Sequence, residues 1–324
     1  MISKTKNYKP IKPFLTYDQQ IEHLQKDKKL IINDVDSAKD ALANISYYAL
    51  IGGYKTLFYD PMTRTYLPGT TFDDILTLYL FDEKLRHLVF EYSNIIEQKL
   101  RSSISYAFCV ARNSNRQNEY LNPANYQNTK KNRYNIGKLL HILKYITFNN
   151  PEGYLVYQRN TYGNVPLYAA IKALTFGQLS VMFSLVVQNI QIPVSQSFST
   201  SHTSMSVNDL IMYLQVLTHF RNRCAHIERL FSYNDLHDIP DTALHKKMGI
   251  PQKGTQYICG KHDLFAIVIA YRYLLPKDDF KEFKKELTKL IDKTVRKAST
   301  LTEDKLLKAM GFPENWKKIT MYLV

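Results

Sequence analysis

Residues 72–110 read FDDILTLYLFDEKLRHLVFEYSNIIEQKLRSSISYAFCV, and this stretch decides the fold class. Its large apolar residues recur at spacings of three and four, with charged residues between them. These residues are Ile75, Leu78, Tyr79, Leu85, Leu88, Val89, Ile95, Ile96 and Leu100. The periodicity predicts one long amphipathic helix that buries one face.

Helical periodicity continues through most of the remaining chain. Further helices are predicted from residues 16 and 37 onward, and over 131–148, 165–190, 206–231, 264–275 and 277–298. Alternation typical of strands is rare, and the sequence contains no internal repeat. We therefore predict an all-α fold, a helical bundle with amphipathic helices at its C-terminal end.

A chain of 324 residues is long enough for two domains, or for one domain with extensions. We expect an N-terminal helical extension at residues 1–70 and a helical core at 71–275. The core carries a basic insertion around 111–165. A C-terminal helical segment follows at 276–324.

Composition excludes several classes of protein. At 45% hydrophobic and 22% charged residues, the chain is neither disordered nor fibrous. No apolar run approaches the roughly 18 residues of a membrane span, and MISKTKNYKPIKPF lacks the apolar stretch of a secretory signal. Cys109, Cys224 and Cys259 are odd in number and widely spaced, which argues against disulfides. We expect a cytoplasmic protein with no membrane partner.

Nine histidines raise the question of a metal site. No cysteine pair has ligand spacing, and Cys259 with His262 is a single doublet. His219 and His226 lie seven residues apart, about 10 Å along a helix axis, which is too far for both to bind one ion. We therefore expect no metal and no cofactor.

The net charge of +14 is concentrated in one part of the chain. From Lys99 to Lys144 there are nine Lys or Arg against one acidic residue, and aromatic residues are interleaved with them. Basic groups with aromatic stacking platforms are typical of surfaces that bind single-stranded nucleic acid. The candidate RNA-binding residues are Arg112, Arg116, Lys130, Lys131, Arg133, Lys138 and Lys144. A solvated helix face above core aromatics fits the same pattern.

The interval 173–220 contains no Lys or Arg, and it ends abruptly at Arg221. The apolar stripe of the helix expected there runs straight into this guanidinium, which is costly unless it meets an anion or faces an interface. His226 follows five positions later, about 140° around an ideal helix. The two side chains therefore cannot easily meet on one phosphate from a single straight helix. Two copies packed about a two-fold axis could bring both pairs to one cleft.

The string RNRCAHIERLF at residues 221–231 resembles the signature of the Abi family of abortive-infection proteins, of the AbiD and AbiF type, whose core is a HEPN domain. Four more blocks are similar to that family, in family order. They are KPFLTYDQQIEHLQKDKKLIIND (12–34), NISYYALIGGY (44–54), FDEKLRHLVFEYSNIIEQKLRSSISY (81–106) and LTFGQLSVMF (174–183).

The resemblance implies a homodimeric HEPN endoribonuclease in which Arg221 and His226 form the catalytic pair. Asn222 matches the polar position beside the arginine. It precedes His226 by four positions, so on a helix its side chain is close enough to orient the imidazole. Glu97 and Arg101 match a charged pair in the long helix, although Glu before Arg at i, i+4 is also an ordinary stabilising pair. Some HEPN toxins carry a Tyr, the target of inhibitory nucleotide transfer, where this chain has Glu228.

The chemistry of RNA cleavage fits these residue types. The 2′-hydroxyl is the internal nucleophile, so the reaction needs a base, an acid for the leaving 5′-oxygen and positive charge on the phosphorane. An imidazole, with an ordinary pKa of about 6.5, serves as base or acid, and Arg matches phosphate oxygens. The expected products are a 2′,3′-cyclic phosphate and a 5′-hydroxyl, with DNA inert.

Two other functions remain open at this point. The chain could be a non-catalytic RNA-binding module that holds a structured, antitoxin-like RNA on its basic surface. It could also be a helical interaction protein in which Arg221 and His226 only cap a helix end.

Overall fold

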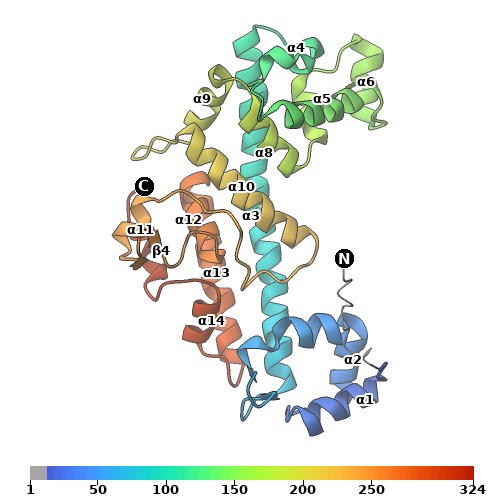
Figure 1. The fold of residues 1–324 in the computed structure, drawn as a ribbon, viewed down its shortest axis with the longest axis vertical. Coiled ribbons are helices and arrows are strands. Elements are labelled where there is room, and N and C mark those ends of the chain that lie inside the picture. Colours follow the sequence, from blue (N-terminus) through green and yellow to red (C-terminus); the bar gives the residue numbers. More distant parts are fainter. Residues whose placement is uncertain (1–12) are drawn as a thin grey trace, which may run out of the picture. The chain divides into compact units, whose positions relative to one another are not determined.

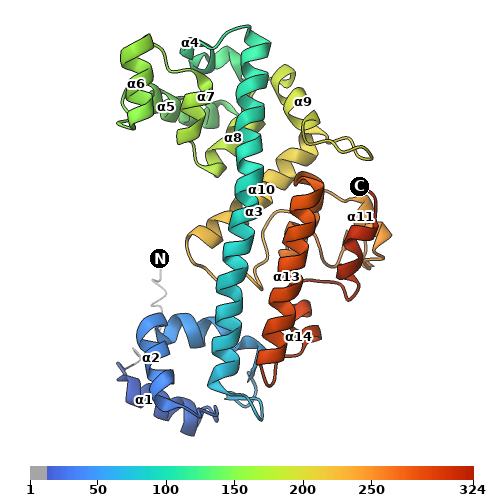
Figure 2. The same cartoon turned by 180° about the vertical axis from the view of Figure 1, so that it is seen from behind.

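The computed structural model describes residues 13–324. This part of the chain is built from helices with two short strand pairs (Figures 1 and 2), which confirms the predicted all-α fold. The α-helices are α1 (Tyr17–Glu22), α2 (Val35–Ile45), α3 (Phe72–Arg112), α4 (Gln117–Leu121), α5 (Arg133–Phe148), α6 (Gly153–Tyr162), α7 (Leu167–Ala170), α8 (Phe176–Leu185), α9 (Gln188–Gln196), α10 (Val207–Ala225), α11 (Ala243–Lys247), α12 (Leu264–Leu274), α13 (Lys277–Lys297) and α14 (Glu303–Ala309).

Shorter elements connect these helices. The π-helical turns are η1 (His23–Asp27) and η2 (Tyr48–Gly52), and the 3-10 turns are η3 (Lys55–Leu57), η4 (Pro123–Asn125), η5 (Ile171–Ala173) and η6 (Trp316–Met321). Strand β1 (Tyr59–Asp60) pairs antiparallel with β2 (Thr65–Tyr66), and β3 (Gln252–Lys253) pairs in the same way with β4 (Gln256–Tyr257).

Helix α3 is one continuous helix of 41 residues, as the periodicity predicted. The predicted apolar residues are buried, apart from Tyr79 and Ile95, which are half-buried. Figure 2 shows α3 along its whole length. Because one helix carries residues from Phe72 to Arg112, it can anchor several later segments of the chain.

The chain divides into two compact units. The first contains the residues up to Phe81 together with Ile291–Lys305, and the second contains Asp82–Leu290 with Leu306–Val324. Within the first unit, the buried carboxylate of Asp74 accepts hydrogen bonds from the backbone N–H of Ser299 (2.6 Å) and the hydroxyl of Thr300 (3.0 Å). These bonds fasten the segment after α13 to the first turn of α3.

Helix α12 forms the centre of the second unit. All of its residues except Arg272 are buried. The hydroxyl of Tyr271 donates to the carbonyl oxygen of Val89 (2.6 Å) and lies 2.7 Å from the hydroxyl of Ser93, so α12 is fixed against α3. Helix α10 contacts both α8 and α12. Neither α12 nor any other described helix is long and apolar enough to cross a membrane.

Residues 165–190 do not form the single helix that the periodicity predicted. The hydroxyl of Thr175 accepts a hydrogen bond from the backbone N–H of Gln178 (3.3 Å), and this cap starts α8. Val186 and Val187 are extended and separate α8 from α9. Apolar residues continue across both breaks, so the hydrophobic pattern alone does not mark them.

Asp263 caps the N-terminus of α12. Its buried carboxylate accepts hydrogen bonds from the backbone N–H groups of Gly260 (2.8 Å) and Ala266 (3.0 Å). Burial raises the pKa of Asp263 to about 6, against the opposing effect of these hydrogen bonds. Because the folded chain keeps this proton to a higher pH than the unfolded chain does, the free energy of unfolding falls as pH rises through this window.

We expect Asp263→Asn to remove this pH dependence, because asparagine caps a helix without titrating. From about pH 4 to pH 7, the free energy of unfolding of the wild type should fall relative to that of the variant by about 2 to 3 kcal/mol. Urea denaturation of both proteins across this range measures the difference. Parallel pH profiles would contradict the prediction.

Candidate functional site

The sequence RNRCAHIERLF lies at the C-terminal end of α10. This helix ends at Ala225, earlier than the predicted residue 231, because Ile227 adopts a positive φ of 58°. Arg221 and Asn222 are therefore in the last turns of α10, and His226 is the first residue beyond it. The side chain of His226 is exposed.

A buried carboxylate on α3 fixes the path of the chain after His226. Asp82 is 0% exposed and accepts hydrogen bonds from the backbone N–H groups of Leu230 (3.0 Å) and Phe231 (2.7 Å). The same carboxylate pairs with Arg86 at 2.6 Å. The side chains of Leu230 and Phe231 are fully buried. The segment that leaves the motif is thus held to α3 by both polar and apolar contacts.

Arg221 points toward α3. Its Nη2 lies 3.5 Å from Oε2 of Glu97, and its guanidinium lies 4.9 Å from the centre of the Phe90 ring. Nε of Arg221 and Oε2 of Glu97 are buried, with no hydrogen-bond partner in the described part of the chain. The guanidinium that looked costly on the apolar stripe therefore faces a carboxylate and an aromatic ring.

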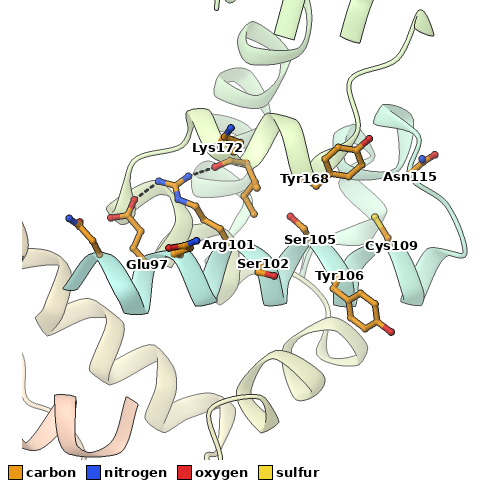
Figure 3. A pocket seen from close by; sticks show the side chains of 12 residues that line it. Glu97, Arg101, Ser102, Ser105, Tyr106, Cys109, Asn115, Tyr168 and Lys172 are labelled. Atoms are coloured by element: carbon orange, nitrogen blue, oxygen red, sulfur yellow. Dashed lines mark hydrogen bonds and ion pairs between the residues drawn. The ribbon is translucent and has the colours of Figure 1, made fainter. Parts of the chain in front are cut away.

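Glu97 also pairs with Arg101, one turn further along α3, so Arg221, Glu97 and Arg101 form a row of three charged side chains. Arg101 pairs with Glu97 and donates to the carbonyl oxygens of Ile171 and Leu174, the latter at 2.6 Å. Figure 3 shows Arg101, paired with Glu97, reaching from α3 to the segment around Lys172. The structure thus brings Arg221, Glu97 and Arg101 together, and the carbonyl contacts give Arg101 a structural role.

An open cavity of about 860 Å³ lies along the same part of α3. Glu97, Arg101 and Lys172 line it at one end, and Tyr106 and Tyr168 line it further along (Figure 3). Tyr106 is 74% exposed. This cavity offers aromatic faces and cationic groups beside the row of three charged side chains.

His226 lines a different pocket, of about 290 Å³. Asn222 and Arg223 line the same pocket from α10. Arg223 pairs with Glu228 (2.9 Å), and its guanidinium stacks 4.1 Å from the centre of the Tyr233 ring. The pocket therefore combines the exposed imidazole of His226 with the guanidinium of Arg223, which Glu228 and Tyr233 hold in place.

The two residues of the expected catalytic pair do not meet in one pocket. Arg221 faces Glu97, whereas His226 lines the pocket at the helix end, and Arg221 is not among the described residues around that pocket. The angle of about 140° between positions five apart accounts for the divergence. Asn222 does share the pocket with His226. The backbone N–H of His226 donates a hydrogen bond to the carbonyl oxygen of Asn222 (2.9 Å).

The His226 pocket is also lined by a cluster that the sequence did not reveal. The carboxylate of Asp235 is 1% exposed and lies 2.7 Å from Nδ1 of His219 and 3.0 Å from Nδ1 of His237. Burial by itself would raise the pKa of Asp235, but hydrogen bonds from His237 and His219 outweigh burial and hold that pKa below its usual value. Asp235 is therefore an anion between two imidazoles.

The only sequence signal for this cluster was the short spacing of Asp235 and His237 in a turn-rich stretch. Helical spacing relates His219 only to residues near it in the sequence, and it gives no information on residues beyond position 231. The contact forms because the chain turns back along α10 after Phe231. That turn depends on Asp82, which is distant in the sequence, so no local pattern indicates it.

The candidate RNA-binding residues lie at the end of α3, in the loops that follow and on α5. All of them are exposed except Arg112, which is half-buried. The interleaved aromatic residues divide into two groups. Tyr106, Tyr134 and Tyr145 are exposed, whereas Phe108, Tyr120 and Tyr126 are in the core. The basic stretch thus has three accessible aromatic rings.

Residues 40–232 match the sequence profile of the family described as Abi-like protein. The match covers about three fifths of the chain and includes Arg221, Asn222 and His226. The chain therefore belongs to the Abi-like protein family. No curated protein and no solved structure gives a significant match. The family match ends before Asp235 and His237.

Proposed function

We propose that this Abi-like protein is a HEPN-type endoribonuclease of the AbiD/AbiF kind, a toxin that aborts phage infection by cleaving RNA without a metal ion. Its HEPN core would lie within residues 71–275. The observation that carries the proposal is the exposed imidazole of His226, which lines a pocket together with Asn222 and Arg223, all three within the part of the chain that matches the family.

His226 would act as general base toward the 2′-hydroxyl or as general acid toward the leaving 5′-oxygen. Arg221 would stabilise the charge that develops on the phosphorane. Glu97, which is backed by Arg101, faces the Arg221 guanidinium and would orient it.

We further propose that the active form is a homodimer in which both copies contribute to each cleavage site. Within one chain, Arg221 and His226 face different surroundings. Two large apolar side chains near His226 are exposed, Ile227 at 73% and Leu236 at 97%. A second copy that covers them would remove apolar surface from water and would bring a second Arg221 toward the pocket.

The exposed basic residues of α5 and its flanking loops would bind the phosphates of the RNA. Lys138 lies 4.8 Å from the centre of the Tyr134 ring, so a cation and an exposed aromatic face are next to each other. Phosphate contacts and base stacking together favour single-stranded RNA. The same surface would hold an inhibitory structured RNA before activation.

Incubation of the purified protein with RNA in excess EDTA tests the proposal. The expected result is cleavage that leaves 2′,3′-cyclic phosphate and 5′-hydroxyl ends. An RNA with a 2′-deoxynucleotide at the cleaved position is the matched control and should remain intact. Intact RNA in both reactions would overturn the nuclease assignment, and salt-sensitive binding without cleavage would favour the RNA-binding module instead.

A further inference from the structure

Three side chains from two segments converge on one wall of the pocket. His219 comes from α10, and Asp235 and His237 come from the segment that folds back along it. One ligand atom from each residue lies within 4.8 Å of the others. The imidazole rings of His219 and His237 are 5.3 Å apart between centres and are tilted by 50°. Both rings turn Nδ1 toward the same carboxylate.

The three side chains differ in their exposure to solvent. Asp235 is buried, whereas the side chains of His219 and His237 are 40% and 44% exposed. The hydroxyl of Tyr233 (3.1 Å) and the backbone N–H of His237 (2.8 Å) donate to the Asp235 carboxylate and hold it in place. A fixed anion therefore lies behind two imidazoles that reach solvent.

We propose that His219, Asp235 and His237 bind one divalent transition-metal ion, with zinc as the best fit. Two imidazole nitrogens and one carboxylate oxygen are a donor set that suits zinc. Metal–ligand bonds of about 2.1 Å in a tetrahedron place the ligand atoms about 3.4 Å apart. The observed distances of 2.7 Å and 3.0 Å run from the two Nδ1 atoms to different oxygens of the Asp235 carboxylate, so both would lengthen when an ion enters between the groups.

Binding would exchange the hydrogen bonds at Nδ1 for metal bonds, and each neutral imidazole would carry its proton on Nε2. The hydroxyl of Tyr233 would remain a hydrogen-bond donor to the carboxylate. With three protein ligands, a zinc ion keeps a fourth position, which would face the pocket that His226 and Asn222 line.

The ion would clamp the segment around Asp235 to α10 and so raise the stability of the fold, whereas the contacts of Asp235 with both imidazoles hold the same segment when no ion is bound. This role goes beyond the proposed cleavage, which uses no metal. Asp235 and His237 also lie outside the family match at residues 40–232. Family membership therefore does not imply the site, which depends on this chain's own residues.

Zinc titration of the full-length protein tests the inference. The protein is first treated with EDTA and dialysed, and ZnCl₂ is then added in a calorimeter. We expect one zinc ion per chain and a melting temperature that rises by several degrees. The readout is binding and stability, so it is independent of RNA cleavage. The absence of stoichiometric binding would overturn the inference.

Variants identify the ligands. Asp235→Asn and His237→Ala should each weaken zinc binding by more than about 100-fold. His262→Ala is the matched control, because His262 forms a comparable pair with Asp238 (2.7 Å) and lies outside the cluster. His226→Ala should also bind zinc normally. Unchanged affinity in Asp235→Asn, or loss of affinity in His262→Ala, would assign the metal to another place.

Cobalt gives a second measurement that needs no variant. Cobalt(II) in a tetrahedral site of nitrogen and oxygen ligands absorbs visible light far more strongly than aqueous cobalt does. Titration of the wild-type protein should produce this spectrum with an end point at one ion per chain, and zinc should abolish it. A spectrum that stays that of aqueous cobalt would contradict the proposed site.

Discussion

Replacement of His226 by alanine is expected to lower the rate of RNA cleavage by roughly 10² to 10⁴-fold, the range typical of a lost general acid or base. The fold should tolerate the change, because the side chain is exposed and lies beyond the end of α10. The free energy of unfolding should therefore change by less than about 0.5 kcal/mol. Single-turnover cleavage and urea denaturation measure the two effects.

His202→Ala is the matched control for this loss of activity. His202 is an exposed histidine in the loop before α10, and its removal should leave the cleavage rate unchanged. Equal cleavage by His226→Ala and the wild type would contradict the assignment of the base or acid. A comparable loss in His202→Ala would show that the assay responds to surface charge and not to the pocket.

Mixing two inactive variants distinguishes shared sites from separate ones. A heterodimer of Arg221→Ala and His226→Ala retains one site with an intact Arg221 from one chain and an intact His226 from the other. Activity should therefore return when the variants are mixed. If heterodimers form and no activity returns, the two residues do not act across the dimer interface.

The helices that could be predicted from the sequence are those whose apolar pattern persists over many turns. Helix α3 is the clearest case, because its spacings of three and four continue without a break over its length. The region 165–190 could not be predicted in detail, because apolar residues continue across the positions where its helices begin and end. There the helix boundaries depend on the Thr175 cap and on the extended Val186 and Val187.

The residues of the candidate site also differ in how well the sequence predicts them. Arg221 and His226 were recognised because they lie in one short string, and the angle between them on a helix followed from geometry. The partner of Arg221 was not indicated, because Glu97 looked like half of an ordinary helical pair. Asp235 was missed because its contacts with His219 depend on the path of a loop. Residues that are close in the sequence could be assigned, whereas contacts made by chain reversal could not.

The largest effect on stability is expected for Asp82→Ala. The change should lower the free energy of unfolding by about 3 to 5 kcal/mol, because it leaves a buried guanidinium without this carboxylate. Arg86 is only 3% exposed, so water cannot replace the lost partner. The backbone N–H groups of Leu230 and Phe231 lose their acceptor as well. Glu91→Ala, an exposed acid on the same helix, should change the stability little.

Asp82→Ala should destabilise the fold in two ways, by removing the carboxylate from Arg86 and by removing the acceptor from two backbone N–H groups. A variant that lacks both charges separates these two effects. Asp82→Leu with Arg86→Met replaces the ion pair by apolar side chains, so it should recover much of the lost stability. It should not restore the acceptor for Leu230 and Phe231, whose amide hydrogens should exchange faster than in the wild type. Because these residues fix the chain just after His226, cleavage should stay impaired in the recovered variant. Full activity with fast exchange at Leu230 and Phe231 would contradict the role of Asp82 as the anchor that positions His226.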